Sequence, residues 1–554
     1  MTLELSGTSC PACSSRHRLL VRIAAAMLLV MQSIAWQARA ATMEFDDASV
    51  AELEAAMDAG TLTSRRLVEL CLARIEAYDK QGPKLHAVMA LNPRALEEAK
   101  ALDAERKAKG PRSPIHGIPV ILKDNFDTVQ MPTTGGSVLL EGSVPSKDAY
   151  VVKKLRDAGA IILAKVNLSE FAGGGQFSSL GGQTHNPHDL ARSPSGSSGG
   201  TGAGIAAGYA PLGMGTDTGG SIRGPAAANG VVALRPTLGL LSRSGIIPLA
   251  LSFDTGGPFG RNVADIAAML TVMVGVDPAD DATERSVGKT QADYSKFLVA
   301  GSLKGARIGV ARDFMGRDPD VDWVINSAID RMKKAGATLV DVHYPEWLLE
   351  QSGNFYTAVR WPEFPVQIRD YLATLGPRYP KSLEEMIERA EQFTSTRPDG
   401  AGPNPGRWTL FKNEAASGTM QDYRYTSVKE HVLPAVRAVV EGVITSNKLD
   451  AIIYPTSSTK TPLIAAPPVR TERPGAGGGT YIQSLTGFPD LIVPAGFTGG
   501  DRLPVGLSFV GPAFSEGKLI SLAYSFEQLV HARQRPVNTP ALKGATVVLG
   551  RSSY

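Results

Sequence analysis

Apolar and polar positions along the chain follow two alternating patterns. In residues 64–80, 93–110 and 149–160 the apolar side chains recur every three or four positions, which predicts amphipathic helices. Residues 117–124 and 161–167 are short, nearly continuous apolar runs, which are typical of buried strands. Four later runs of the same kind are flanked by turn residues: 307–312, 451–455, 491–496 and 505–511. Strands that alternate with helices over this length predict an α/β fold, with a mostly buried sheet covered by helices in a single large domain.

Residues 1–40 have the features of an export signal. Basic positions precede an apolar run at 23–31, and Ala38 and Ala40 match the small residues before a signal-peptidase cut. A membrane anchor is the alternative, but the run is shorter than the roughly 18 residues that a spanning helix needs. We therefore expect a mature domain of residues 41–554 in the periplasm or secreted, with no integral membrane segment.

Charge and cysteine content narrow the classes of partner. The 554 residues carry a formal net charge of +3, but the leader holds four arginines and one glutamate, so the mature part is neutral. A neutral chain without a basic run argues against nucleic acid as a partner and favours a small neutral substrate. Cys71 lies on the apolar side of a helical pattern, which predicts a buried thiol. His185 and His188 have no third ligand in view, so we expect neither a metal nor a cofactor.

Glycine and serine are concentrated between residues 171 and 224. A flexible linker would be polar throughout, whereas this segment contains the apolar stretch AGIAAGYAPLGMG. It has neither a dinucleotide fingerprint nor the lysine of a phosphate-binding P-loop. The glycines therefore indicate tight turns or close approach to another group. By contrast, the glycine- and proline-rich residues 396–408 and 473–480 predict surface loops, with a mobile flap as the alternative for the second.

Two serines in the glycine-rich segment compete as a nucleophile. GSSGG at 196–200 matches the elbow of α/β-hydrolase esterases, with Ser198 at its centre. That class needs a histidine base, and the downstream candidates lie in helical or strand-like stretches: His343, His431 and His531. The second candidate is Ser221, which follows two adjacent glycines in GMGTDTGGSIRG.

A lysine is the usual base where histidine is not. Lys123 ends the apolar run GIPVIL, and burial lowers the pKa of a lysine from about 10.4 toward the neutral range that a general base requires. Lys165, in IILAKVN, is a second lysine on an apolar strand. Burial therefore cannot single out one of the two lysines.

Four longer stretches follow one another: GIPVILKDNFDT, NPHDLARSPSGSSGGTGAGIAAG, PLGMGTDTGGSIRGPAAANGVVALRPTLG, and FPDLIVPAG with LPVGLSFVG. In order and spacing they resemble the amidase signature family of Ser–Ser–Lys hydrolases, most densely at 117–239. The resemblance implies a mixed sheet, Ser221 as nucleophile, Ser197 as a bridging serine after a cis peptide bond, and Lys123 as base. It also places Phe171 at the edge of an acyl pocket.

These residue types suit amide hydrolysis. Ser221 loses a proton as it attacks the carbonyl, Ser197 passes that proton to neutral Lys123, and the reverse transfer protonates the leaving nitrogen. We expect the oxyanion to be bound by the backbone N–H groups of four consecutive residues: Thr218, Gly219, Gly220 and Ser221. Asp217 and Arg223 are expected to hold this turn together. Ser195 departs from the family, which usually has glycine there.

The resemblance leaves several amide classes open. Relatives act on fatty acid amides, peptide C-terminal amides, aryl acylamides, small carboxamides, and glutamine for tRNA-linked transamidation. The last needs cytosolic partner subunits, which an exported protein would not meet. Residues 323–337 and 432–445 are amphipathic, but they predict core-packing helices rather than a membrane-facing pair. We expect a hydrolase of peptide amides or other low-molecular-weight amides; a non-hydrolytic transamidation or binding subunit is the alternative, and the oligomeric state is left open.

Overall fold

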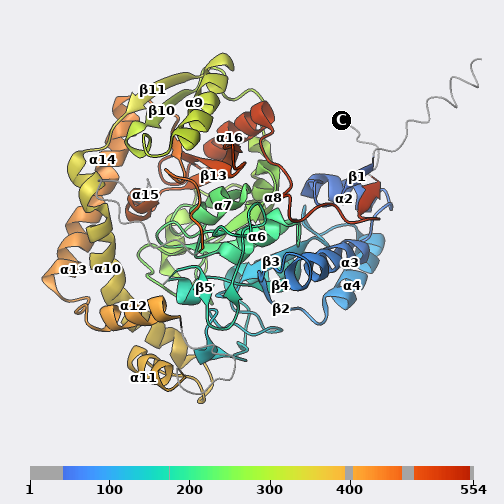
Figure 1. Ribbon diagram of the computed structural model, residues 1–554, viewed down its shortest axis with the longest axis horizontal. Helices are drawn as coiled ribbons and strands as arrows, with labels where there is room; N and C mark the ends of the chain where they lie inside the picture. Colours follow the sequence, from blue (N-terminus) through green and yellow to red (C-terminus); the bar gives the residue numbers. More distant parts are fainter. Residues whose placement is uncertain (1–41, 174, 394–403, 465–479, 549–554) are drawn as a thin grey trace, which may run out of the picture.

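The computed structural model describes residues 42–173, 175–393, 404–464 and 480–548. The predicted export signal at 1–40 lies outside these residues, as do 396–403 and 473–479 of the two predicted loops. The described chain is built on one large sheet with helices on its faces and around its rim (Figure 1). This arrangement confirms the predicted single α/β domain.

The central sheet has eleven strands and is mixed. From one edge to the other the order is β11 (Thr338–Val342), β10 (Arg307–Ala311), β12 (Ala451–Pro455), β14 (Pro504–Val510), β13 (Asp490–Phe497), β8 (Val232–Arg235), β9 (Thr255–Gly260), β7 (Leu212–Asp217), β3 (Pro119–Lys123), β4 (Ile161–Val166) and β2 (Val88–Leu91). Strand β3 pairs in parallel with β4 and β7, whereas β8, β9 and β13 pair antiparallel with their neighbours. All six predicted apolar runs are strands of this sheet.

The N-terminal half supplies helices of 8 to 15 residues. They are α2 (Val50–Asp58), α3 (Ser64–Ile75), α4 (Ala95–Lys109), α5 (Tyr150–Asp157) and α8 (Val263–Met273). Ser49 and Glu52 form a reciprocal capping box at the start of α2. Helix α4 ends at Gly110, whose φ of 81° suits glycine and closes the helix where the sequence predicted. Cys71, on α3, is fully buried, as predicted.

Two glycine- and alanine-rich helices lie against the middle of the sheet. They are α6 (Gly199–Ala206) and α7 (Arg223–Asn229), and α6 is buried along its whole length. A Cβ on Gly200 would lie 2.6 Å from the backbone nitrogen of Asn167. The small residues therefore let α6 approach the loop after β4, and this contact brings residues 196–198 to the sheet edge where β3 and β7 end.

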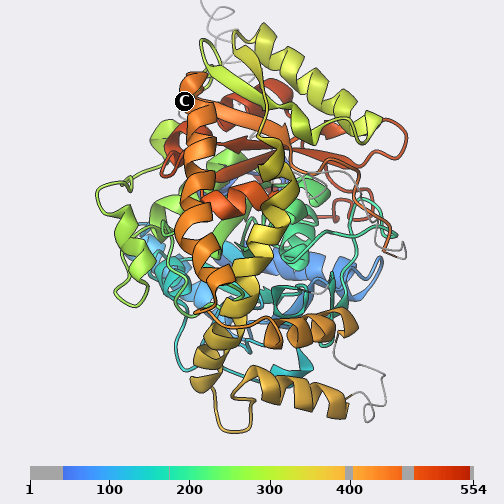
Figure 2. The same cartoon turned by 90° about the vertical axis from the view of Figure 1, so that its left-hand side faces the viewer.

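The C-terminal half adds the longer helices. Helices α10 (Glu346–Ala373) and α14 (Leu433–Ser446) run lengthwise on one side of the molecule (Figure 2). Helices α12 (Pro405–Ala415) and α13 (Tyr423–Ser427) pack against α10, and α11 (Leu383–Phe393) packs against α12. The predicted loop at 396–408 is wrong for its last four residues, because Asn404 caps α12 and Pro405 opens it. Likewise, Thr480 begins α15 (Thr480–Thr486) rather than ending a loop.

Segments 323–337 and 432–445 are core-packing helices, as predicted. The first belongs to α9 (Pro319–Lys334), which packs on β13, and the second is α14, which packs on α15. Helix α16 (Glu516–Val530) covers β13 together with α9. No helix among the described residues is both long and apolar enough to cross a membrane. The two ends of the described chain pair with each other through β1 (Thr42–Glu44) and β15 (Thr546–Val548).

Candidate active site

Lys123 ends β3 and is fully buried. Its Nζ lies 2.7 Å from Ser197 Oγ and 2.7 Å from Thr216 Oγ1, and the carbonyl oxygen of Thr216 is 3.4 Å away. Because β3 and β7 are neighbours in the sheet, the lysine and Thr216 meet at the same strand ends. The structure therefore brings together two of the three predicted catalytic side chains, Lys123 and Ser197.

The second buried lysine has a different partner. In the register of β3 and β4, Leu122 stands opposite Lys165 and Lys123 stands opposite Val166, so the two lysines point to opposite faces of the sheet. Lys165 Nζ forms an ion pair with Asp124 at 3.0 Å. No carboxylate of the described residues lies within ion-pair distance of Lys123. Geometry thus separates two lysines that burial on an apolar strand could not rank.

The surroundings of Lys123 favour its neutral form. Burial lowers the pKa of Lys123 to about 7, and the more distant carboxylates of Asp217 and Asp254 oppose the shift without cancelling it. A lysine with its ordinary pKa near 10.4 would be almost wholly protonated at neutral pH. The lowered pKa of Lys123 therefore leaves neutral lysine available to accept a proton near neutral pH.

The serine segment before α6 reaches the site through an unusual backbone. The peptide bond between Gly196 and Ser197 is cis, and Ser195 has a φ of 62°. Ser198 donates its backbone N–H to the carbonyl oxygen of Ser221 at 3.1 Å. This bond places the backbone of Ser221, which is half-buried, beside the segment of Ser197.

The turn between β7 and α7 is organised around Asp217. Its carboxylate accepts the backbone N–H groups of Gly220 at 3.0 Å and Ile222 at 2.8 Å, and it forms buried ion pairs with Arg223 at 2.9 Å and Arg235 at 3.3 Å. Burial alone would raise the pKa of Asp217, but the two arginines outweigh it and hold that pKa well below its usual range. The predicted structural role of Asp217 and Arg223 is confirmed.

The predicted oxyanion donors are not all free. Because Gly220 donates its N–H to Asp217, it is not available to a substrate in this structure. Among the described residues, no acceptor is recorded for the backbone N–H groups of Thr218, Gly219 and Ser221. Close contact explains the first glycine of the pair, since a Cβ on Gly219 would lie 2.9 Å from Tyr356 Oη. The expected set of four donors is thereby reduced to three.

The esterase alternative has no support in this geometry. Ser198 is buried, and its hydroxyl lies within 3.2 to 3.3 Å of the backbone oxygen and nitrogen of Thr216. No described histidine is bonded to it. His343 follows the edge strand β11 and pairs with Asp313, and His431 and His531 are exposed.

His185 and His188 are loop residues. The ring nitrogens lie 2.7 Å from the carbonyl oxygen of Leu190 and 3.1 Å from that of Asn229, respectively. Burial lowers the pKa of His188 to about 4. In the described part of the chain, no three His, Cys, Asp or Glu side chains are grouped as metal ligands would be.

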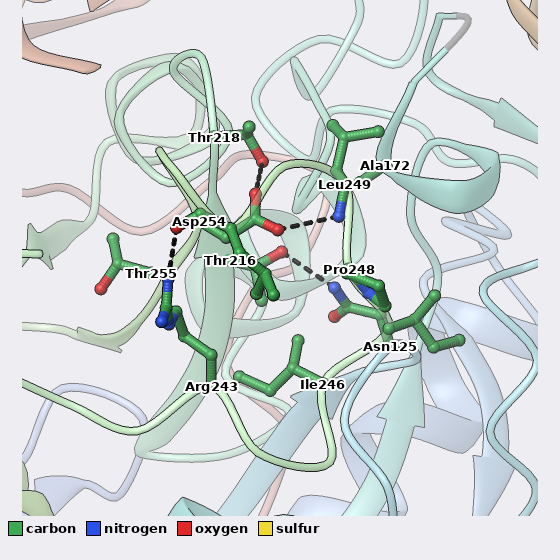
Figure 3. Close-up of a pocket in the computed structure, with 12 residues that line it drawn as sticks. Asn125, Ala172, Thr216, Thr218, Arg243, Ile246, Pro248, Leu249, Asp254 and Thr255 are labelled. Carbon is green, nitrogen blue, oxygen red and sulfur yellow. Dashed lines mark hydrogen bonds between the residues drawn. The ribbon is translucent and has the colours of Figure 1, made fainter. Parts of the chain in front are cut away.

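A narrow pocket opens beside Asn125, Thr216 and Thr218 (Figure 3). It is bounded by the end of β7, by Asn125 after β3, and by residues 246–251. Phe171 is nearly fully buried and packs edge-on against Phe411, and it shares an apolar cluster with two residues of the pocket wall. Phe171 therefore stands behind the wall, whereas its neighbour Ala172 lines the pocket.

Three residues of the site were not predicted. Thr216 bonds Lys123, Asn125 donates its Nδ2 to Thr216 Oγ1 at 3.0 Å, and Asp254 accepts the hydroxyl of Thr218 at 2.5 Å. The motifs contained a signal for the first two. Asn125 stands two residues after Lys123 at the end of its strand, and Thr216 stands directly before Asp217 at the end of the strand that leads into the turn. Asp254 has no such signal, because it follows a long loop.

Comparison with known proteins identifies the family. The family model described as Amidase matches residues 66–520, and the chain belongs to this family. A probable amidase of Arabidopsis thaliana is 33% identical over 535 residues, which are 94% of this chain and 98% of that protein. A glutamyl-tRNA(Gln) amidotransferase subunit of Aromatoleum aromaticum is 37% identical over 497 residues, 87% of this chain and 97% of the relative.

The fold comparison agrees. The X-ray structure of native peptide amidase from Stenotrophomonas maltophilia superposes with a TM-score of 0.79 at 38% identity, covering 89% of this chain and 99% of that one. Family and fold together make this protein an amidase, an enzyme that hydrolyses an amide carbon–nitrogen bond.

Proposed function

We propose that the enzyme works through an acyl-enzyme on Ser221, with Ser197 as the proton bridge and Lys123 as the base. The observation that carries this proposal is the 2.7 Å contact between Ser197 Oγ and a buried lysine whose pKa is about 7. Each group has the ionisation state that its role needs. A neutral lysine accepts a proton, and a serine hydroxyl can donate one proton while accepting another.

In this mechanism the proton that Ser221 loses is later returned to the leaving nitrogen. As Ser221 Oγ bonds to the carbonyl carbon, its proton passes to Ser197, whose own proton passes to Lys123. The oxyanion is bound by backbone N–H groups of the turn, where loss of one such donor typically costs about 3–4 kcal/mol of barrier. The path then reverses to protonate the leaving nitrogen, the carbon–nitrogen bond breaks, and water releases the carboxylate by the same sequence.

We propose peptide amides or other low-molecular-weight amides as substrates of an exported enzyme, periplasmic or secreted. The likeness to a peptide amidase supports the substrate class, and the basic–apolar–small pattern of residues 1–40 supports export. The even charge balance of the mature chain supports a small neutral substrate over nucleic acid.

A second candidate is a subunit of a tRNA-dependent amidotransferase. It is favoured by the likeness to the amidotransferase subunit of Aromatoleum aromaticum at 37% identity. The two candidates differ in what the isolated chain does: a hydrolase turns over amides alone, whereas a transamidation subunit needs partners.

The test is to incubate the purified mature chain with a panel of amides and to measure ammonia or amine release. Turnover without a partner, lost in Ser221→Ala, is expected. Lys123→Ala should lower the rate by orders of magnitude, with partial recovery at higher pH, whereas the matched Lys165→Ala should retain most of the activity of the folded fraction. No turnover of any amide, or turnover that survives Ser221→Ala, contradicts the proposal.

A further inference from the structure

Asp254 joins the turn between β7 and α7 to the wall of the pocket (Figure 3). One of its carboxylate oxygens accepts the Thr218 hydroxyl at 2.5 Å, and the other accepts the backbone N–H groups of Leu249 at 2.8 Å and Ala250 at 2.9 Å. Thr218 is the first residue of the turn, whereas Leu249 and Ala250 belong to the segment before β9. A single side chain therefore fixes these two segments relative to each other.

The segment that carries this carboxylate is itself held by helix α10. Glu363 accepts the backbone N–H of Ser252 at 3.1 Å and also its hydroxyl. One turn further along α10, Gln367 accepts the backbone N–H of Leu251 at 2.9 Å. The segment is thus a fixed support rather than a free loop.

The same segment also reaches the second residue of the turn. Phe253 stacks on Tyr356 of α10, with ring centroids 5.2 Å apart, and a Cβ on Gly219 would lie 2.9 Å from Tyr356 Oη. Among the described residues, the backbone N–H groups of Thr218 and Gly219 have no recorded acceptor. Asp254 directly, and Phe253 through Tyr356, therefore hold the two residues that carry these N–H groups.

The carboxylate of Asp254 is buried without a cation beside it. The residue is only 8% exposed. Arg243, which lines the same pocket, pairs instead with Asp280, and in the described part of the chain no cation lies within ion-pair distance of Asp254. A buried charge without an ion-pair partner lowers stability, so stability alone would favour a neutral side chain here. The position of this carboxylate against the turn indicates a role in the reaction.

We propose that Asp254 is a positioning residue for oxyanion binding: through the Thr218 hydroxyl it keeps the backbone N–H groups of Thr218 and Gly219 directed at the carbonyl oxygen of the bound amide. The inference rests on the proposed function, in which that oxygen becomes negatively charged as Ser221 bonds to the carbonyl carbon. In this role Asp254 touches neither the substrate nor the reacting atoms. Its effect is largest in the transition state, where the oxygen carries the charge.

The first test is Asp254→Ala, measured by steady-state kinetics and by inhibition. We expect kcat for N-acetylphenylalaninamide to fall about 100-fold with little change in KM, because loss of one aligned oxyanion donor costs about 10²–10³ in kcat. N-acetylphenylalaninal, an aldehyde to which Ser221 adds to form an oxyanion, should bind about 100-fold more weakly. The corresponding alcohol, N-acetylphenylalaninol, forms no oxyanion and should keep its affinity. Equal losses for the aldehyde and the alcohol, or an unchanged aldehyde affinity, would overturn the inference.

Variants of Thr218 test whether Asp254 acts through this hydroxyl. Thr218→Val removes the hydroxyl and keeps the shape, so it should weaken aldehyde binding as Asp254→Ala does. The double variant should be no worse than either single one, since both changes break the same contact. Thr218→Ser keeps the hydroxyl and should lose much less. Additive losses in the double variant would contradict the proposal, and Thr218→Val carries the same comparison of aldehyde and alcohol if Asp254→Ala does not fold.

The matched control is Asp79→Ala. Asp79 is likewise buried and accepts two backbone N–H groups, those of Ala87 at 2.7 Å and Val88 at 3.1 Å, but it lies beside the edge strand β2. This variant should lower the midpoint of thermal unfolding and leave kcat and aldehyde affinity of the folded enzyme near the wild-type values. An equal loss of aldehyde affinity in Asp79→Ala would show a general effect of destabilisation and overturn the proposal. Amide turnover that survives Ser221→Ala would instead refute the proposed function and, with it, the basis of this inference.

Discussion

Lys123 is surrounded as a neutral amine would be. Such an amine has two N–H donors and one lone pair, and its neighbours are the two oxygens of Thr216 and the hydroxyl of Ser197. When both N–H groups point to Thr216, the lone pair faces Ser197 Oγ and can take its proton. Thr216 therefore orients the amine of Lys123, and the absence of a carboxylate within ion-pair distance among the described residues leaves burial to lower its pKa.

The pH profile follows from this environment. Because burial lowers the pKa of Lys123 to about 7, we expect kcat/KM for an amide to rise as pH increases through 7 and to level off above it. Because kcat/KM reports ionisation of the free enzyme, the midpoint of the rise should be the same for different amide substrates. A rise near pH 10, the range of an exposed lysine, would contradict the assignment.

The sequence predicted which segments meet at the site better than it predicted their individual contacts. Lys123 and Ser197 were predicted from motifs, and the structure places them in contact, while the roles of Lys123, Ser197 and Ser221 stay predictions. Thr216 was missed, since which polar residue of a strand touches the lysine depends on strand order. The free N–H of Gly220 was wrongly expected, because a motif does not reveal where the Asp217 carboxylate turns.

At the scale of elements, the β7–α7 turn depends on one carboxylate. Asp217→Asn would leave Arg223 and Arg235 buried with less compensation, and breaking a buried pair in this way typically costs about 3–5 kcal/mol. We expect a clear drop in the midpoint of thermal unfolding. The matched control is Asp341→Asn, which breaks a largely exposed pair with Arg312 and should leave the midpoint nearly unchanged.

Helix α6 offers a second pair of variants. Gly200→Ala would force a Cβ against the backbone of Asn167, so α6 must shift and the protein should lose stability together with activity. Gly442→Ala, in α14, meets no atom within 4 Å and should stabilise the protein by up to about 1 kcal/mol, because alanine is the better helix former. Thermal unfolding measures both, and equal effects would contradict a packing role for Gly200.

Two elements, β9 and α10, were not predicted from the sequence, and each has a physical reason. Strand β9 reads TGGPFG, which resembles a turn, yet its Gly257 is required because a Cβ there would lie 2.1 Å from the backbone oxygen of Leu234. Helix α10 runs 28 residues through Pro362 and Pro365, which a local pattern treats as helix breakers. In both cases tertiary packing overrides local preference, whereas the six apolar strands and the amphipathic helices at 64–80, 93–110 and 149–160 agree with their surroundings and were predicted.

At the scale of the whole molecule, the titration of buried Lys123 makes the free energy of unfolding depend on pH. Between pH 7 and about 10 the unfolded chain holds a proton on Lys123 that the folded chain has lost, so stability from this group rises with pH in that window. Compared with Lys123→Met, the wild type should gain about 3 kcal/mol between pH 7 and 9.5. The measurement is the difference in unfolding free energy between the two proteins at each pH, and a constant difference would mean that Lys123 is charged when folded.

The pairing of β1 with β15 places the two ends of the described chain at one spot on its surface. Met43 stands opposite Val547, so a short linker would join the ends without crossing the fold. The domain is therefore suited to circular permutation, with new ends opened in a surface connection far from β3 and β7. For the same reason, a tether at either end would leave the molecule at the same place when the enzyme is immobilised.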